Sequence, residues 1–581
     1  MIRRNIVVCN FATGGEEALG LFDKVWHLPL NWFGLKHIPA VPIQLAGLLD
    51  TILKRNERAK EALRARHSLT NLYTIDGQTA TGEQFLYGPS EKLMALSLEH
   101  PEQFAMSWPN FEGVFARYAH LIRDYAATLT DPEEATRQFW PFFAEHGTAY
   151  NLLILRKVGT ADLARLQSLF APFWPRESNE LARGKLFFID LSIFTDVPSG
   201  TLDGFTRFTP ATVTLLEQDP DTKALKPFAV RVSGQDDAGA QIFVKGQATP
   251  SAWLYALQAA RTSLTVYGIW LGHVYHWHIV TAAMQMTMYN TFRRRHPVYQ
   301  LLAPQSNYLF QFDELLLLVW NAIAPPTSVT TRCGILHLLD RFAEGRDYFA
   351  DDPTTTLQTY GLVEADFTRD KPWDLYPAAQ RLLQLFSYTQ SYVEAFVTNT
   401  YANDQLVAED RHLQEWMRKS GHRHGGNIRG LPVLNSRAAL TRVLTSMIYR
   451  ITAHGISRMM PSVHPALTFL GNAPPCLQID AIPSPQATLT TGELLAYLPK
   501  TGTIGSMMNF GTTFAFTTPY VPFVPEVGNQ PDPAADLFFP GGPDDPRNGA
   551  LVAYRQALME FINAYSPDYP TIGQWPRNIE L

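Results

Sequence analysis

The 581-residue chain contains little cysteine: three residues, Cys9, Cys333 and Cys476. They lie far apart and form no Cys-x-x-Cys pair, which argues against a disulfide framework and against a zinc ribbon. Free thiols are typical of a reducing compartment. We therefore expect the protein to be cytoplasmic.

Long apolar runs and an excess of basic charge are also missing. No stretch reaches 18 uninterrupted apolar residues, and the closest, 315–324, is typical of a buried helix. The first ten residues hold too short an apolar run for a signal peptide. The net charge of −6 argues against nucleic acid as the main partner. The basic run 293–295 is interpreted as a solvated helix face.

The N-terminal part is apolar and reads as helical. Residues 15–65 are rich in apolar side chains and are interrupted by three prolines. We expect a helical layer that packs on a larger core; the alternative is a lid that makes transient contact with a membrane. Helical periodicity continues over 90–182, for example in 111–129 and 132–143. We therefore predict an N-terminal extension over 1–180 and a main domain over 181–581.

The main domain begins with strand-like segments and continues with helical ones. The strand-like segments are 184–194, 211–218, 222–234 and 241–246, with a turn at Asp219-Pro220-Asp221. Amphipathic helical patterns cover 251–295, 309–323, 332–343, 376–401, 404–419, 436–460 and 549–564, whereas 465–545 is typical of loops. The predicted fold class is mainly α, one large helical domain with a small antiparallel sheet.

A dense histidine cluster is the strongest local signal. His273, His276 and His278 place three of the sixteen histidines within six residues of an apolar segment. Neutral imidazole is a common ligand for transition metals. On a regular α-helix, residues five apart differ by about 140° in direction. A π-helical turn would bring His273 and His278 onto one face, whereas His273 and His276 share a face without distortion, so spacing leaves both pairs open.

Other histidines lie in two different sequence contexts. His454 lies in a second apolar helical pattern, where it is either a ligand or a core histidine. His422 and His424 lie in a polar, glycine-rich segment and are interpreted as surface residues.

Several short motifs in order resemble the lipoxygenase family. They are Gly184-Lys-Leu-Phe-Phe-Ile-Asp190, Leu225-Lys-Pro-Phe-Ala229, Trp253, His273-x4-His278, His296-Pro-x-Tyr299-x-Leu-Leu302, Tyr376-Pro377, Tyr401-x-x-Asp404, Asp410-x-x-Leu-Gln-x-Trp416, His454 and Pro576-Arg-Asn-Ile-Glu-Leu581. Each motif is weak alone, and the resemblance covers roughly residues 180–581.

The resemblance implies a helical fold around one non-haem iron, with manganese as the alternative metal. The implied ligands are His273, His278, His454 and the terminal carboxylate of Leu581, which leaves His276 outside the ligand set. The implied partners are an unsaturated fatty acid and O2. The implied reaction removes a hydrogen from the fatty acid and inserts O2 to give a hydroperoxide.

The chain departs from the family pattern near this site. Arg458 stands where the family has a fourth side-chain ligand, and a guanidinium has no lone pair to offer. It could instead pair with a substrate carboxylate. Gly268-Ile269 replaces a His-Gln pair, and Leu316 stands where a small residue tunes oxygen entry. Two alternatives therefore stay open: the same scaffold acting on a non-lipid substrate, or a non-catalytic lipid-binding homologue.

Overall fold

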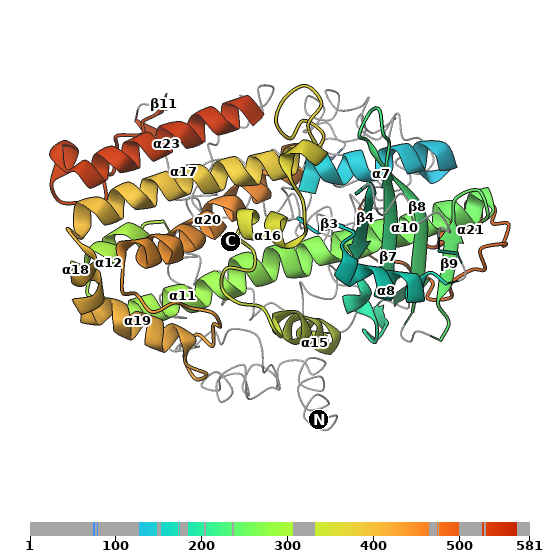
Figure 1. The fold of residues 1–581 in the computed structure, drawn as a ribbon, viewed down its shortest axis with the longest axis horizontal. Coiled ribbons are helices and arrows are strands. Elements are labelled where there is room, and N and C mark those ends of the chain that lie inside the picture. Colours follow the sequence, from blue (N-terminus) through green and yellow to red (C-terminus); the bar gives the residue numbers. More distant parts are fainter. Residues whose placement is uncertain are drawn as a thin grey trace.

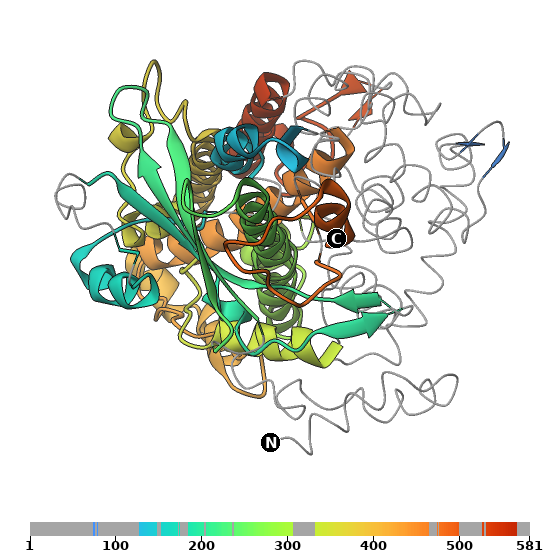
Figure 2. The ribbon, with the colours of Figure 1, turned by 90° about the vertical axis from the view of Figure 1, so that its right-hand side faces the viewer.

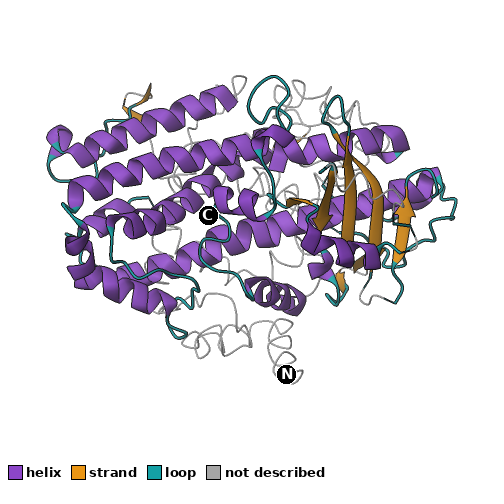
Figure 3. Ribbon diagram, viewed as in Figure 1, coloured by secondary structure: helices purple, strands orange, loops and turns teal. Residues whose placement is uncertain are grey.

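The computed structural model describes residues 74–75, 78–79, 127–147, 153–171, 173–174, 184–202, 205–234, 238–305, 332–463, 473–474, 476–498, 526–527 and 530–565. Helices dominate this part of the chain, and the main sheet stands at one end of it (Figure 3). The predicted mainly helical fold with one small antiparallel sheet is confirmed.

The sheet has five antiparallel strands in the order β3-β4-β7-β8-β9. They are β3 (Leu155–Lys157), β4 (Leu186–Asp190), β7 (Ala211–Gln218), β8 (Leu225–Ser233) and β9 (Gln241–Val244). The predicted turn joins β7 to β8, and the Asp219 carboxylate accepts the backbone N–H groups of Asp221 and Thr222. β3 lies in a stretch expected to be helical. Because β3 pairs with β4, the sheet takes strands from both sides of residue 180; the domain division stays a prediction.

Alternating side chains bury both faces of the sheet. Phe187 belongs to the main core, whereas its neighbour Phe188 packs with Leu166 on the opposite face, as the two-residue period of a strand requires. Helices α7 (Pro132–His146) and α10 (Pro250–Tyr267) pack on the sheet, and α8 (Thr160–Leu169) contributes Leu166. In Figure 2 the sheet lies toward the viewer, with the long helices running behind it.

One long helical rod runs from residue 250 to residue 289 and consists of three segments. These are α10, the π-helix η7 (Gly268–Ile279) and α11 (Val280–Tyr289). Thr249 caps the rod, because its hydroxyl accepts the N–H of Ala252. The predicted helix over 251–295 ends earlier than expected, at Tyr289.

The basic run 293–295 follows the rod rather than lying on it. These arginines are exposed, which confirms a solvated run, but the helix-face interpretation was wrong. The reason is the next helix, α12 (Pro297–Leu302). It starts at Pro297 with His296 as its N-cap, and the chain must leave the rod to make that start.

The remaining helices form layers along the rod (Figure 1). They are α15 (Arg332–Ala343), α16 (Pro353–Thr359), α17 (Pro377–Thr400), α18 (Asp404–Glu409), α19 (Arg411–Gly421), α20 (Arg437–Val463), α21 (Thr491–Ala496) and α23 (Pro546–Tyr565). α20 packs on η7 and α11, and α17 lies between α20 and α23. The pattern 404–419 forms two helices instead of one, because Asp410 ends α18 and caps α19.

Short elements complete the described structure. The two-stranded pairs are β1 (Thr74–Ile75) with β2 (Gln78–Thr79), β5 (Gly200–Leu202) with β6 (Phe205–Arg207), and β10 (Glu526–Val527) with β11 (Gln530–Pro531). The 3-10 turns are η4 (Ala127–Leu129), η6 (Ser192–Phe194), η8 (Glu364–Asp366) and η10 (Gly542–Asp544).

Some sequence predictions fall outside the described residues. These are the apolar segment 15–65 with its alternative membrane contact, and the helix expected over 309–323. In the ranges that are described, no helix combines the length and the apolar character needed to cross a membrane.

Candidate metal centre

The π-helix η7 includes both His273 and His278, which is one of the two arrangements that the histidine spacing left open. A backbone N–H at its end, that of Val280, bonds to the carbonyl of Tyr275, five residues earlier. With this i to i+5 bonding, positions 273 and 278 are separated by one turn of the helix. The π-helical turn inferred for this segment is therefore confirmed. The assignment of the two histidines as metal ligands stays a prediction.

His273 has a described side chain. It is half-buried, and its ring meets the ring of Trp277 edge-on, with the centroids 5.2 Å apart and the planes at 70°. Trp277 is 1% exposed, so the contact fixes one side of the imidazole against a rigid neighbour.

The other predicted site residues are described less completely. The side chains of Ile269, His278, His454 and Arg458 lie outside the described part, as do residues Leu316 and Leu581 altogether. Among the side chains that the structure does describe, no three potential metal ligands come together. The backbone nevertheless places His273 and His278 on η7, and His454 and Arg458 on α20, which packs against η7.

His276, the third histidine of the cluster, has a different partner. It is 2% exposed, and its Nδ1 contacts the Asp351 carboxylate, which lies between α15 and α16. Burial lowers the pKa of His276 to about 4, against the opposing pull of Asp351. His276 is therefore neutral at pH 7 and donates its Nδ1 proton to the carboxylate. The contact engages only one of the two ring nitrogens, and the exclusion of His276 from the ligand set stays a prediction.

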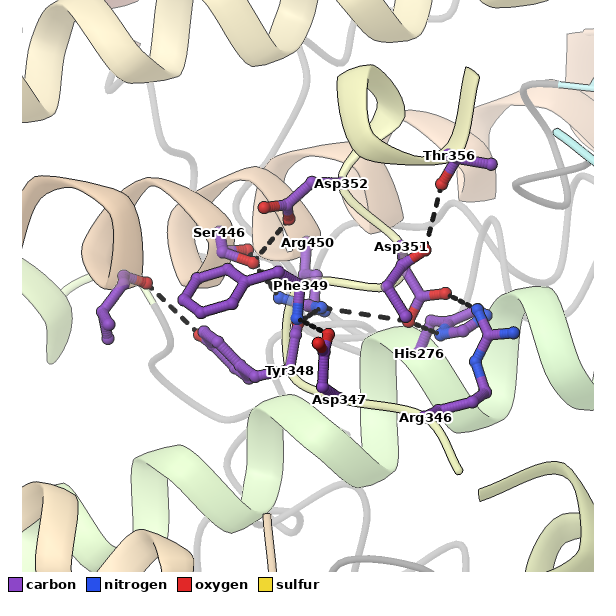
Figure 4. A network of polar contacts seen from close by, with 12 residues as sticks. His276, Arg346, Asp347, Tyr348, Phe349, Asp351, Asp352, Thr356, Ser446 and Arg450 are labelled. Carbon is purple, nitrogen blue, oxygen red and sulfur yellow. Dashed lines mark hydrogen bonds and ion pairs between the residues drawn. The ribbon is translucent and has the colours of Figure 1, made fainter. Parts of the chain in front are cut away.

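Asp351 is the centre of a buried charge cluster (Figure 4). Arg346 contacts its Oδ1 atom, and Arg450 of α20 lies 3.9 Å from its Oδ2 atom. Burial alone would raise the pKa of Asp351, but Arg346 and His276 outweigh it and hold that pKa well below its usual range. The carboxylate is therefore ionised and compensated on both sides, as a buried charge must be.

Arg450 connects the cluster to the turn segment that precedes α16. Its guanidinium is 2% exposed, contacts the Ser446 hydroxyl and the Tyr348 carbonyl, and lies 4.6 Å from the centre of the Tyr348 ring. The Ser446 hydroxyl in turn donates to Asp352 over 2.6 Å. Burial raises the pKa of Asp352 to about 6, although Arg450 acts in the opposite direction.

A second polar cluster brings together residues from several of the motifs that resemble lipoxygenases. The Asp410 carboxylate accepts hydrogen bonds from the Nε2–H of His296 over 3.0 Å and from the hydroxyl of Tyr401 over 2.8 Å. The Nδ1 atom of His296 accepts the N–H of Val298, which leaves the proton on Nε2. Asp410 also accepts the N–H groups of His412 and Leu413 at the start of α19. These residues tie α12, α17 and α19 together, so their role is structural.

Neighbouring motif residues make similar connections. The indole N–H of Trp416 donates to the Met284 carbonyl of α11 over 3.1 Å, and that of Trp253 donates to Thr136 of α7 over 2.8 Å. His422 and His424 are exposed, which confirms that they are surface residues. Sequence reasoning missed Asp351, Arg346 and Arg450. The available signal was a charged residue, Arg450, inside the apolar pattern 436–460.

Comparisons with known proteins agree with the fold. A family model described as lipoxygenase matches residues 372–489. The chain is 24% identical over 329 residues to the human polyunsaturated fatty acid lipoxygenase ALOX15B and 26% identical over 327 residues to mouse ALOX8. Each match covers 55% of this chain, and 47% and 46% of the two relatives. The chain thus spans about half the length of the curated relatives it matches.

Solved structures match over more of the chain. A fungal lipoxygenase from Fusarium graminearum superposes with a TM-score of 0.63 at 15% identity, covering 85% of this chain and 78% of that structure. The coral 8R-lipoxygenase gives a TM-score of 0.61 at 16% identity, with coverages of 77% and 65%. These matches define the class of the fold, the mainly helical domain of lipoxygenase structures. The family model, the curated relatives and the solved structures named here are all lipoxygenases, so the chain is similar to lipoxygenases in sequence and in fold.

Proposed function

We propose that this protein is a non-haem iron dioxygenase that converts a polyunsaturated fatty acid and O2 into a lipid hydroperoxide. The observation that carries the proposal is the π-helix η7, which sets His273 and His278 one turn apart and packs against the helix that carries His454. The relatives are named polyunsaturated fatty acid lipoxygenases, which supports the substrate class.

The residues fit the metal. Three imidazole positions on two packed helices, with the Leu581 carboxylate as a fourth donor, are a donor set that suits iron. The manganese alternative has no support in the comparisons. Bound iron would supply the one-electron chemistry that removes a hydrogen atom from a bis-allylic CH2 group. That atom returns to the product, so the substrate and O2 combine into one hydroperoxide.

The chain's own residues hold and shield the site. Leu271 and Trp277 of η7 are 0% and 1% exposed, so this part of the π-helix lies in a water-excluded core. Trp277 restrains the ring of His273 by its edge-on contact. α10 and α11 continue η7 at both ends without a break, which gives the two histidine positions a rigid support.

Arg458 is proposed to bind the substrate carboxylate. A guanidinium cannot coordinate a metal but pairs readily with a carboxylate. Arg458→Ala is expected to raise KM for a free fatty acid and to leave KM for its methyl ester unchanged. An unchanged KM for the free acid would refute this role. Ile269 and Leu316 are proposed to shape the same substrate pocket, because they replace family residues near the metal and the oxygen path.

The function is tested by oxygen uptake and conjugated-diene absorbance with linoleate and arachidonate. Iron-loaded protein is expected to consume O2 and to form diene, whereas His273→Ala is expected to do neither. Iron-loaded protein that consumes no O2 with any polyunsaturated acid would overturn the fatty-acid proposal and favour a non-lipid substrate. Protein that cannot be loaded with metal would favour a non-catalytic lipid-binding homologue.

A further inference from the structure

The buried cluster around Asp351 connects the two helices that carry the candidate metal ligands. His276, between His273 and His278 on η7, contacts the Oδ2 atom of Asp351. Arg450 of α20 lies 3.9 Å from the same oxygen and stands four residues, about one helical turn, before His454. One carboxylate oxygen therefore faces both helices, next to each group of histidine positions.

The segment that carries Asp351 is itself firmly held. Tyr348 donates its N–H to the Arg429 carbonyl over 2.8 Å and its hydroxyl to the Val443 carbonyl of α20 over 3.3 Å. Thr356 at the start of α16 donates to the Ala350 carbonyl over 3.1 Å. These bonds hold the chain on both sides of Asp351, and the bond to Val443 attaches this segment to α20.

The His276 ring is also confined by aromatic neighbours. Phe342 of α15 meets it edge-on at 5.2 Å between centroids, and the Arg346 guanidinium lies 4.4 Å from the centre of the same Phe342 ring. Tyr275 packs edge-on against Phe342 at 5.1 Å. The imidazole is thus aimed at Asp351 by packing, and its Nδ1 contacts the carboxylate.

We propose that Asp351 is a positioning residue that locks η7 to α20 through His276 and Arg450, and so fixes the spacing of the three histidine positions. This inference rests on the proposed function for its link to metal binding. The mechanical part, that Asp351 stabilises the π-helical turn, does not depend on metal and can be measured without it. Replacing His276 or Asp351 should loosen η7 locally, because each carries one half of a buried charge-assisted bond.

The test compares two variants of the lock with two controls. His276→Phe keeps the aromatic packing and removes only the donor, so it is expected to fold even if Asp351→Asn does not. Asp366 of η8 binds Lys157 of β3 over 2.8 Å, outside the cluster around Asp351, so Asp366→Asn is the matched control. Asp410→Asn lowers stability at the distant His296 cluster and controls for a general loss of stability.

The first measurement is amide hydrogen exchange of η7 in metal-free full-length protein. His276→Phe and Asp351→Asn are expected to speed exchange in 268–279 by roughly tenfold or more, the scale of one buried bond to a charged group. In the two control variants, the exchange rate of 268–279 should change no more than the exchange rate of the protein as a whole. Unchanged exchange in both lock variants would overturn the proposal, whatever the metal content of the protein.

The second measurement is the rate at which iron-loaded protein releases iron to a chelator. The lock variants are expected to release iron roughly tenfold faster or more, and the controls at the wild-type rate. Faster exchange in η7 with unchanged iron release would overturn the part of the proposal that concerns the metal. If the wild-type protein binds no iron, the proposed function is contradicted. The hydrogen-exchange result would still decide whether Asp351 stabilises the π-helical turn.

Discussion

Asp410→Asn should destabilise the protein in a way that depends on pH. Asparagine is as good a helix cap as aspartate, so its side-chain oxygen can still accept the N–H groups at the start of α19. Its amide nitrogen, however, would face the Nε2–H of His296, which is a donor. The variant therefore loses a charge-assisted bond over 3.0 Å and leaves a partly buried donor unsatisfied. The expected loss is about 2 kcal/mol at pH 7.

The pH dependence follows from the titration of Asp410. Burial raises its pKa, but the hydrogen bonds from His296 and Tyr401 outweigh burial and lower the pKa to about 2. Because the folded pKa lies below the unfolded value of about 3.9, the ionised carboxylate stabilises the fold above about pH 4. This contribution, roughly 1–2 kcal/mol after solvent screening, is lost as the pH falls through about 2.

The assay is urea denaturation of the wild type and Asp410→Asn from pH 7 down to pH 3. The difference between their midpoints should be largest at pH 7 and should shrink to about half at pH 3. Asp370→Asn, at an exposed ion pair with Arg369, is the control and should cost below about 0.5 kcal/mol. A difference that stays constant from pH 7 to pH 3 would refute the assignment of the charge to Asp410.

Three further predictions concern other buried polar contacts. Burial raises the pKa of Asp352 to about 6. The protonated carboxyl therefore contributes its full stability below about pH 4, and this contribution declines as the pH rises through 6. In Asp352→Asn the denaturation midpoint should no longer show this decline. Trp416→Phe should cost about 1 kcal/mol of stability, because the buried Met284 carbonyl loses its indole donor and keeps only the Thr287 hydroxyl as a side-chain donor. Trp253→Phe should cost a similar amount, because its indole N–H bonds to Thr136, and a loss in thermal denaturation checks both tryptophans.

The sequence predicted those features that arise from local periodicity. The strand-like segment 211–218 coincides with β7, and η7 forms the π-helical turn that would align His273 and His278, one of the two arrangements that the spacing left open. The helix ends earlier than expected because it stops at the C-cap Asn290, although the three arginines that follow are good helix formers. β3, with three residues, is too short to show a two-residue period.

The rest could not be predicted because it depends on contacts between distant segments. Nothing near Asp351 in the sequence indicates that it will meet both His276 and Arg450. The same holds for Asp410, whose partners His296 and Tyr401 come from other helices. Charged residues within apolar patterns indicated that partners must exist, but only the fold identifies them.

The metal content of the protein tests the central claim most directly. Purified protein, reconstituted with ferrous iron and desalted, is expected to hold about one iron per chain by elemental analysis. His454→Ala is expected to hold much less, because it removes one of three imidazole donors on the two packed helices. A wild-type protein that retains neither iron nor manganese after reconstitution would contradict the account.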